Sequence, residues 1–372
     1  MRDRCLLPVL LTATLLGVAP CPAAAEPVKV FILAGQSNMV GYGKTLNGLN
    51  PDFDPKQPQS RTNQREVPGG VGCLAWAVQT MPGTYGFGGT HALVDARGDW
   101  LVRDDVSVYA RMEVFQEKDS QGQPTGRLTE GVTRKGPHTV GFGKANSARQ
   151  KWNGPEFGFG HVVGNALSQD VLIIKVATGG TSLQVDWRSP TAVSKRGGAV
   201  GFMWTHLLDT VNRVVSNLDA EFPAYAGRGY EIAGFGWHQG WNDRVNAASV
   251  DEYEANLVDF IADVRGAFGA GLPFVIATTG MEMPTDQTSS AWKLVAAQAA
   301  VADAAKYPAH AGNVAVVDTV PMYRDRTQSP STFGYHWNHN GLAYFDIGAG
   351  MGAAMLKIMP EPATPAGAAR AQ

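Results

Sequence analysis

Short apolar runs rich in β-branched residues recur along the chain, separated by longer segments with apolar residues at helical spacing. Runs of this length and composition are typical of buried strands. They cover residues 28–34 (VKVFILA), 171–177, 230–237, 273–279 and 314–318. The period of 3.6 residues predicts helices in the segments that alternate with these runs. The predicted helices cover residues 157–168, 202–218, 250–268, 290–306 and 341–359.

The stretch 44–155 breaks this alternation, because it is rich in Gly, Pro, Asn and Gln and has few long apolar runs. Within it, residues 100–106 and 108–116 are predicted to form a hairpin that turns near 103–105, and 121–124 a surface turn. We interpret 44–155 as a long insertion with local β structure that lies over one end of the main sheet.

Five strands separated by helices predict an α/β fold, in which a mostly parallel five-stranded sheet is covered by helices on both faces. We expect a single domain over residues 26–359, followed by a disordered Pro- and Ala-containing tail at 360–372. Ligands of such sheets bind beyond the carboxyl ends of the strands.

The first 25 residues have the features of a secretory signal peptide. Arg2 and Arg4 precede an apolar run at 6–18, and alanines at 23–25 suit cleavage after Ala25. The run is shorter than the ~20 residues of a membrane span, so an anchor is the less favoured alternative. We therefore expect a secreted or periplasmic protein with no membrane span after signal removal. Cys73 would be its single cysteine, which excludes an internal disulfide.

The composition narrows the function classes. Hydrophobic residues are 44% and charged residues 17% of the chain, as in globular proteins, and the net charge of −2 argues against nucleic-acid binding. The histidines lack metal-ligand spacing, and no phosphate loop or dinucleotide fingerprint follows the first strand. We predict neither a metal nor a cofactor.

Polar residues follow three predicted strands and precede the last helix. Ser37 follows the first strand, Gly179 and Gly180 the second, and Gln239 and Asp243 the third. His336 and His339 come shortly before the last helix. All of these segments fall on one edge of the predicted sheet, which favours a shared site. Separately each signal is weak, since a serine after a strand is more often a helix cap.

This set of residues suits acyl transfer, which needs a nucleophile, a base with an orienting partner, and donors for the oxyanion. Ser37 can be the nucleophile and a C-terminal histidine the base. The main-chain N–H groups of Ser37 and Gly180 and the side-chain amide of Gln239 can form the oxyanion hole.

Four segments resemble the SGNH (GDSL-like) hydrolases, namely carbohydrate esterase family six and the sialic-acid-specific acetylesterase group. They are residues 30–39 (VFILAGQSNM), 175–183 (KVATGGTSL), 237–243 (WHQGWND) and 334–338 (GYHWN). The resemblance runs from about residue 28 to 357, interrupted by the insertion. It implies a three-layer α/β/α, flavodoxin-like fold.

The resemblance assigns roles to individual residues. Ser37 matches the nucleophile, Gly180 and Gln239 match the oxyanion-hole positions, and His336 or His339 matches the base. We prefer His336, because the run around it fits the family better. Many relatives have an Asp three residues before the histidine, whereas this position is Phe333 for His336 and His336 itself for His339. The chain also has Trp241 where a Glu is common.

The sequence therefore leaves open which acid orients the histidine. Asp243 is our candidate because it lies just beyond the third strand, with Asp318 and Asp346 as weaker candidates. A Ser–His dyad, with a backbone carbonyl holding the imidazole, is the alternative. We assign substrate binding to residues beside these positions. They are Gln36, Asn38, Trp241, Trp337 and His339.

The sequence thus predicts a serine esterase that removes O-acetyl groups from a carbohydrate, either an acetylated polysaccharide or sialic acid, through an acyl-enzyme on Ser37. A non-catalytic carbohydrate-binding protein on the same fold and a lipid or thioester acyl hydrolase are the alternatives. The sequence leaves the sugar and the oligomeric state open.

Overall fold

The computed structural model describes residues 26–46, 70–144 and 152–360. The predicted signal peptide and residues 361–372 of the predicted tail lie outside the described residues, and the single domain over 26–359 stays a prediction. Within the described part of the chain, no helix combines the length and the apolarity that a membrane crossing needs.

A seven-stranded sheet forms the centre of the fold, with the order β11-β10-β9-β1-β8-β3-β6. Neighbouring strands are parallel except β6, which runs antiparallel to β3. The strands are β1 (Val28–Gly35), β3 (Val106–Met112), β6 (Val132–Pro137), β8 (Val171–Ala177), β9 (Tyr230–His238), β10 (Phe274–Ala277) and β11 (Val314–Val317). The predicted α/β fold with a mostly parallel sheet is confirmed.

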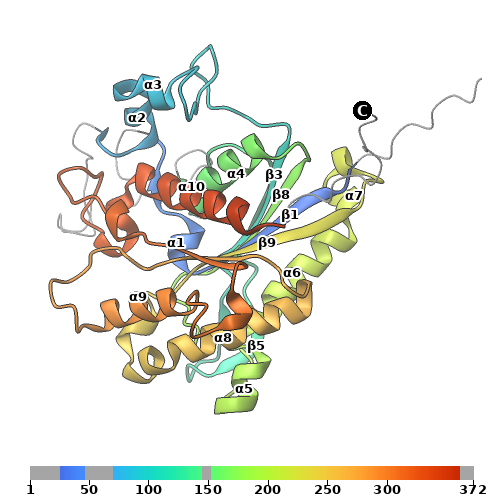
Figure 1. Cartoon of the computed structure of the whole chain (residues 1–372), viewed down its shortest axis with the longest axis vertical. Coiled ribbons are helices and arrows are strands. Elements are labelled where there is room, and N and C mark those ends of the chain that lie inside the picture. Colours follow the sequence, from blue (N-terminus) through green and yellow to red (C-terminus); the bar gives the residue numbers. More distant parts are fainter. Residues whose placement is uncertain (1–25, 47–69, 145–151, 361–372) are drawn as a thin grey trace, which may run out of the picture.

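Helices cover both faces of the sheet (Figure 1). One face carries α6 (Phe202–Ser216), α8 (Ala247–Phe268) and α9 (Ser290–Ala300), and the other carries α4 (Pro155–Ala166) and α10 (Gly341–Ile358). Strand β1 shows why. Its side chains alternate between the two cores, with Val30 and Ile32 packed under α6 and α8 and Phe31 and Leu33 under α4 and α10. A strand buried on both faces must be apolar throughout.

Shorter elements connect these layers. The short helices are α1 (Ser37–Val40), α2 (Leu74–Thr80), α3 (Pro82–Tyr85), α5 (Pro190–Arg196) and α7 (Leu218–Glu221). The short strands pair as β2 (Gly43–Lys44) with β7 (Trp152–Asn153) and β4 (Gln116–Lys118) with β5 (Pro124–Leu128). The 3₁₀ turns are η2 (Pro223–Tyr225), η3 (Asp243–Val245), η4 (Pro308–His310), η5 (Val320–Met322) and η6 (Gly334–His339).

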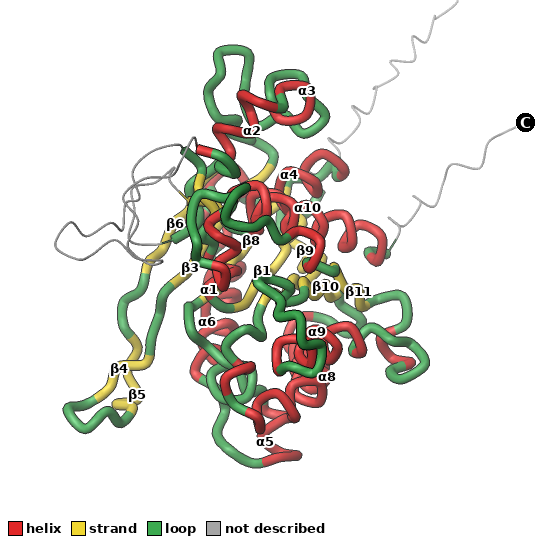
Figure 2. Tube along the Cα trace, turned by 90° about the vertical axis from the view of Figure 1, so that its left-hand side faces the viewer, coloured by secondary structure: helices red, strands yellow, loops and turns green. Residues whose placement is uncertain are grey.

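The segment 44–155 differs from the prediction, because it contributes β3 and β6 to the main sheet and raises the number of strands from five to seven. The predicted hairpin of 100–106 with 108–116 is wrong. Residues 106–112 form one strand, whose partners are β8 and β6. The predicted turn at 121–124 does exist, since it joins β4 to β5 in a hairpin that projects from the molecule (Figure 2).

Candidate active site

Ser37 lies at the middle of the carboxyl edge of the sheet, because β1 runs between β8 and β9. Gly35 ends the strand where the main chains come close. A Cβ at this position would lie 2.2 Å from His238 O, so no larger residue fits without a shift. Ser37 then opens the four-residue helix α1 and is 7% exposed.

A buried cation holds the far end of α1. Lys175, on β8, is fully buried, and its Nζ donates to Val40 O (2.9 Å) and to the Glu156 carboxylate (2.7 Å). The Glu156 carboxylate offsets the charge, as a buried ion requires. The helix that carries Ser37 is thereby tied to the neighbouring strand.

Gln36 ties the same turn to the loop after β9. Its Oε1 accepts the main-chain N–H groups of Gly240 and Asn242, each at 3.1 Å. The side chain is 3% exposed. Gln36 Oε1 is therefore used inside the protein, and substrate binding by Gln36 stays a prediction.

Gln239 links the loops after β8 and β9. Its Nε2 donates to Thr181 O (2.9 Å) and to Asp243 Oδ2 (2.6 Å), and its Oε1 accepts from Tyr253 (3.2 Å). A side-chain amide has two hydrogens. Both are donated to protein acceptors here, which corrects the expectation that Gln239 donates to an oxyanion.

Asp243 does not reach a histidine. Its carboxylate accepts the N–H groups of Leu183 (3.0 Å) and Gln184 (3.2 Å) as well as the Gln239 amide, because η3 turns the side chain toward the loop after β8. Burial raises its pKa to about 6, although these hydrogen bonds favour the ionised form. In residues 26–46, 70–144 and 152–360, no hydrogen bond joins Asp243 to a histidine. The expectation that Asp243 orients the base is corrected.

The two weaker candidates for that acid also have other surroundings. Asp318 is exposed and caps the N–H of Val320 at 3.0 Å. Asp346 pairs with Arg324 at 2.5 Å. Neither is hydrogen-bonded to His336 or His339 within the described part of the chain.

The glycine pair lies beside Ser37. A Cβ at Gly179 would lie 3.6 Å from Ser37 Cβ, in ordinary contact. Gly180 has a φ of 70°, in the left-handed region that favours glycine, and a Cβ there would meet no atom within 4 Å. The main chain at Gly180 is therefore open to an incoming group.

The two ends of the described chain meet next to Ser37. Asn38 Nδ2 donates to Tyr335 O at 3.1 Å, across 297 residues of sequence, and Asn38 Oδ1 accepts from Tyr344 at 2.8 Å. Asn38 follows Ser37, and Tyr335 precedes His336. Since Asn38 is 1% exposed, it joins the two segments and is not a substrate contact, which corrects the expectation for this residue.

His336 is held by aromatic rings. Its ring stacks on Tyr42 with centroids 4.0 Å apart and planes 19° apart, and Tyr335 lies 4.4 Å away. No carboxylate bonds to it among the residues that the structure describes. Burial and the nearby Lys144 lower the pKa of His336 to about 3. The imidazole is therefore neutral at neutral pH, which is the form that accepts a proton.

His339 has a different environment from His336. It is buried, stacks on Phe333 with centroids 4.8 Å apart, and contacts Trp152 edge to face at 5.1 Å. Burial lowers its pKa well below the usual value. His336 is the more accessible of the two histidines, and the contact of His339 with substrate stays a prediction.

Two of the predicted substrate-binding residues are tryptophans with contacts inside the protein. Trp337 is fully buried in the core under α10, which corrects the expectation that it binds substrate. Trp241 is partly buried, and the Arg244 guanidinium lies 4.2 Å from its ring centroid. That face of Trp241 is already covered by a cation.

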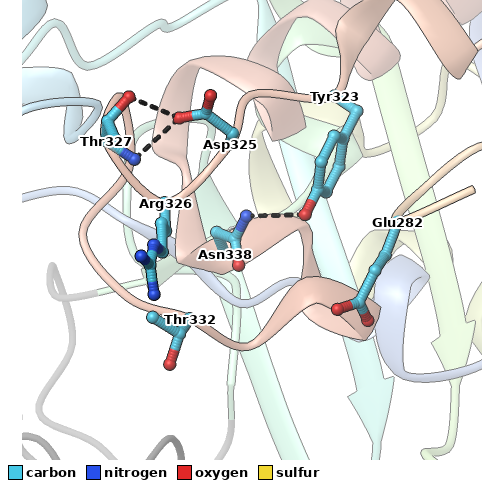
Figure 3. Close-up of a pocket in the computed structure, with 7 residues that line it drawn as sticks. All are labelled: Glu282, Tyr323, Asp325, Arg326, Thr327, Thr332 and Asn338. Atoms are coloured by element: carbon cyan, nitrogen blue, oxygen red, sulfur yellow. Dashed lines mark hydrogen bonds between the residues drawn. The ribbon is translucent and has the colours of Figure 1, made fainter.

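A polar cavity of about 630 Å³ opens beside the turn that carries His336 (Figure 3). Asn338 from η6 reaches into it and donates to the Tyr323 hydroxyl at 2.9 Å. Its lining is Glu282, Tyr323, Asp325, Arg326, Thr327, Thr332 and Asn338. A cavity with this many hydroxyl, amide and charged groups suits a polyhydroxylated ligand.

Sequence reasoning missed three residues of this region: Tyr42, Glu113 and Lys144. Glu113 follows β3 directly, so the strand assignment could have revealed it at the edge of the sheet. Tyr42 follows the Ser37 segment closely, but no local pattern indicates that its ring stacks on His336.

The model of one protein family matches more than half of the chain. It is the family described as carbohydrate esterase, sialic acid-specific acetylesterase, and the match covers residues 136–356. The chain belongs to this family. The matched span includes Gly180, Gln239 and His336, whereas Ser37 precedes it. Membership of this family supports an esterase.

Three solved structures are similar to this family member at low identity. A protein from Arabidopsis thaliana is 15% identical with a TM-score of 0.49, covering 89% of this chain and 98% of its own. A carbohydrate acetylesterase from Xanthomonas citri is 12% identical with a TM-score of 0.47, covering 88% and 55%. NanS is 14% identical with a TM-score of 0.44, covering 90% and 98%. A search of curated protein sequences found no match.

Proposed function

We propose that the protein is a serine esterase that removes O-acetyl groups from a carbohydrate through an acyl-enzyme on Ser37. One observation carries the proposal most directly. The hydrogen bond from Asn38 to Tyr335 O holds the segments of Ser37 and His336 together at the carboxyl edge of the sheet. Family membership supports the acetyl ester of a sugar as the substrate class.

In the proposed reaction, Ser37 Oγ attacks the acetyl carbonyl carbon while His336 takes the hydroxyl proton. The oxyanion is held by the main-chain N–H groups of Ser37 and Gly180. His336 then gives its proton to the sugar oxygen as the ester bond breaks. Water then gives a proton to the same imidazole and attacks the carbonyl carbon of the acetyl-enzyme. As the bond from this carbon to Ser37 Oγ breaks, His336 returns the proton to Ser37 and acetate leaves.

The other residues of the edge act as positioning residues in this proposal. Gln36, Gln239 and Asp243 fix the loops on either side of Ser37 by hydrogen bonds. Tyr42 fixes the imidazole by stacking, in place of a carboxylate. The site therefore works as a Ser–His dyad.

The proposed substrate is an acetylated polysaccharide or acetylated sialic acid, and the cavity that Asn338 of η6 lines has the polar groups that such a sugar requires. Export by the signal peptide, with a secreted or periplasmic location, belongs to the same proposal.

Acetate release and chain-length preference test this function. The purified protein should release acetate from acetylated glycans, and its turnover of nitrophenyl esters should fall steeply beyond butyrate. Ser37→Ala should lose both activities, by roughly 10⁴-fold or more in kcat. Turnover that rises with chain length would indicate a lipid acyl hydrolase instead.

The Phe333 departure favours one competing function, a carbohydrate-binding protein without catalysis, because no carboxylate bonds to His336 within residues 26–46, 70–144 and 152–360. Glycan binding measured by calorimetry, with no acetate released from any bound acetylated glycan, would establish that alternative.

A further inference from the structure

Glu113 is fixed at the carboxyl edge of the sheet, next to the loop that contains the glycine pair. It directly follows β3, and its N–H donates to Ala177 O at 3.0 Å. The next residue, Val114, exchanges two hydrogen bonds with the Thr178 hydroxyl, at 3.1 and 3.2 Å. Glu113 is thus attached to the end of β8, the neighbour of β1 (Figure 1).

The backbone of Glu113 is strained. Its φ is 57°, in the left-handed region that non-glycine residues rarely adopt. Such conformations cost free energy and persist where the surroundings fix them, and they cluster at functional sites. A glycine would remove the strain, so the side chain has a use that offsets it.

The Glu113 carboxyl group faces the same space as the nucleophile. A Cβ at Gly179 would lie 3.7 Å from Glu113 Oε1 and 3.6 Å from Ser37 Cβ. Oε1 is buried and has no hydrogen-bond partner among the described residues. A buried acceptor without a partner is costly, so it indicates a donor that arrives with a ligand.

The charges around Glu113 fit a hydroxyl as that donor. Burial raises the pKa of Glu113, while the Gly179 N–H and the Lys144 ammonium lower it. Lys144 also lies 5.4 Å from the ring centroids of Tyr42 and Trp152, so it belongs to the same edge. A hydroxyl both donates and accepts, so it can bond this carboxyl group whether the group is ionised or protonated.

We propose that Glu113 is a specificity-determining residue that binds a free hydroxyl of the sugar on the carbon next to the acetyl ester. An acetyl group offers no donor, whereas the neighbouring carbons of a sugar carry hydroxyls close to the ester. The inference rests on the proposed function, because the sugar reaches Glu113 only when its ester lies at Ser37.

The experiment compares two matched substrates: a monoacetylated sugar with a free hydroxyl beside the ester, and its deoxy analogue without that hydroxyl. The measured quantity is the ratio of their kcat/KM values. Glu113→Gly removes the carboxyl group and suits the left-handed backbone. We expect it to lower the ratio by about 10- to 100-fold, the loss typical of a hydrogen bond to a charged group. Its melting temperature should stay equal or rise, because the strain is relieved.

Glu113→Gln keeps a polar group of the same size and should retain more of the ratio than Glu113→Gly. Glu117→Gln, on the nearby strand β4, is the control and should leave the ratio unchanged. A ratio that Glu113→Gly does not lower, or an equal loss on both substrates, would overturn the proposal. The proposed function is checked separately, since acetyl turnover that survives Ser37→Ala would overturn that function and this inference together.

Discussion

The two halves of the candidate site are held by different kinds of interaction, hydrogen bonds on one side and aromatic stacking on the other. On the nucleophile side, buried polar groups form a connected hydrogen-bond network of Gln36, Gln239 and Asp243 with main-chain N–H groups. On the histidine side, His336 lies against Tyr42 and Tyr335, and no carboxylate bonds to it among the described residues.

In the proposed mechanism, aromatic rings and no carboxylate of the described residues position the base. Phe333, where the resemblance implies an aspartate in many relatives, stacks on His339. Aromatic stacking supplies orientation but adds no negative charge that would stabilise an imidazolium. Substitutions in the buried network on the nucleophile side should therefore lower stability, whereas substitutions of the rings around His336 should act mainly on the pH dependence of activity.

The largest expected effect follows removal of the base. His336→Ala should lower kcat by roughly 10⁴-fold or more, since dyad members act as a unit with the nucleophile. Turnover of a nitrophenyl acetate, with circular dichroism as the folding check, measures this. His339→Gln is the comparison. If that variant folds and loses more activity than His336→Ala, the base has been assigned to the wrong histidine.

A smaller effect is expected from the polar network. Asp243→Asn places an amide NH₂ against donors that now meet a carboxylate, and should cost about 1–3 kcal/mol of stability. Thermal unfolding measures this loss, and kcat should fall with it as the loops beside Ser37 shift. The exposed Asp318→Asn is the matched control. Equal melting temperatures for both variants would mean that the network does not hold the site.

The smallest expected effect follows substitution of Tyr42 and concerns the pH dependence of kcat/KM. In the wild type, kcat/KM should stay constant from pH 7 down to pH 5, because the pKa of His336 is lowered to about 3 and protonation removes the base only near that value. Tyr42→Leu lets water reach the imidazole, so its pKa should rise toward the usual 6.5 and activity should fall below that pH. Tyr42→Phe keeps the ring and should keep the flat profile. A wild-type profile that already falls near pH 6.5 contradicts this account.

The apolar pattern predicted the central strands of the sheet, because β1, β8 and β9 are buried on both faces and their sequences are therefore nearly continuous apolar runs. Strand β3 was misassigned because its pairing with β8 spans a long sequence separation that no local pattern reports. The expectation that Ser37, Gly180 and His336 share one edge followed from their positions in the sequence, directly after predicted strands or before the last helix.

The polar roles were harder to predict. Gln239 and Asp243 were placed at the right edge, yet their side chains bond to each other, because donors and acceptors are matched only in three dimensions. Trp337 was expected to bind substrate, but it is buried in the core, within a stretch of left-handed backbone at residues 337–339.

Covalent labelling tests the central claim most directly. A fluorophosphonate probe reacts with a serine whose hydroxyl is activated by a neighbouring base. Mass spectrometry of the labelled protein should find one adduct, on the peptide that contains Ser37, and Ser37→Ala should abolish it. A folded protein that gives no adduct, or an adduct on another serine, would contradict the account.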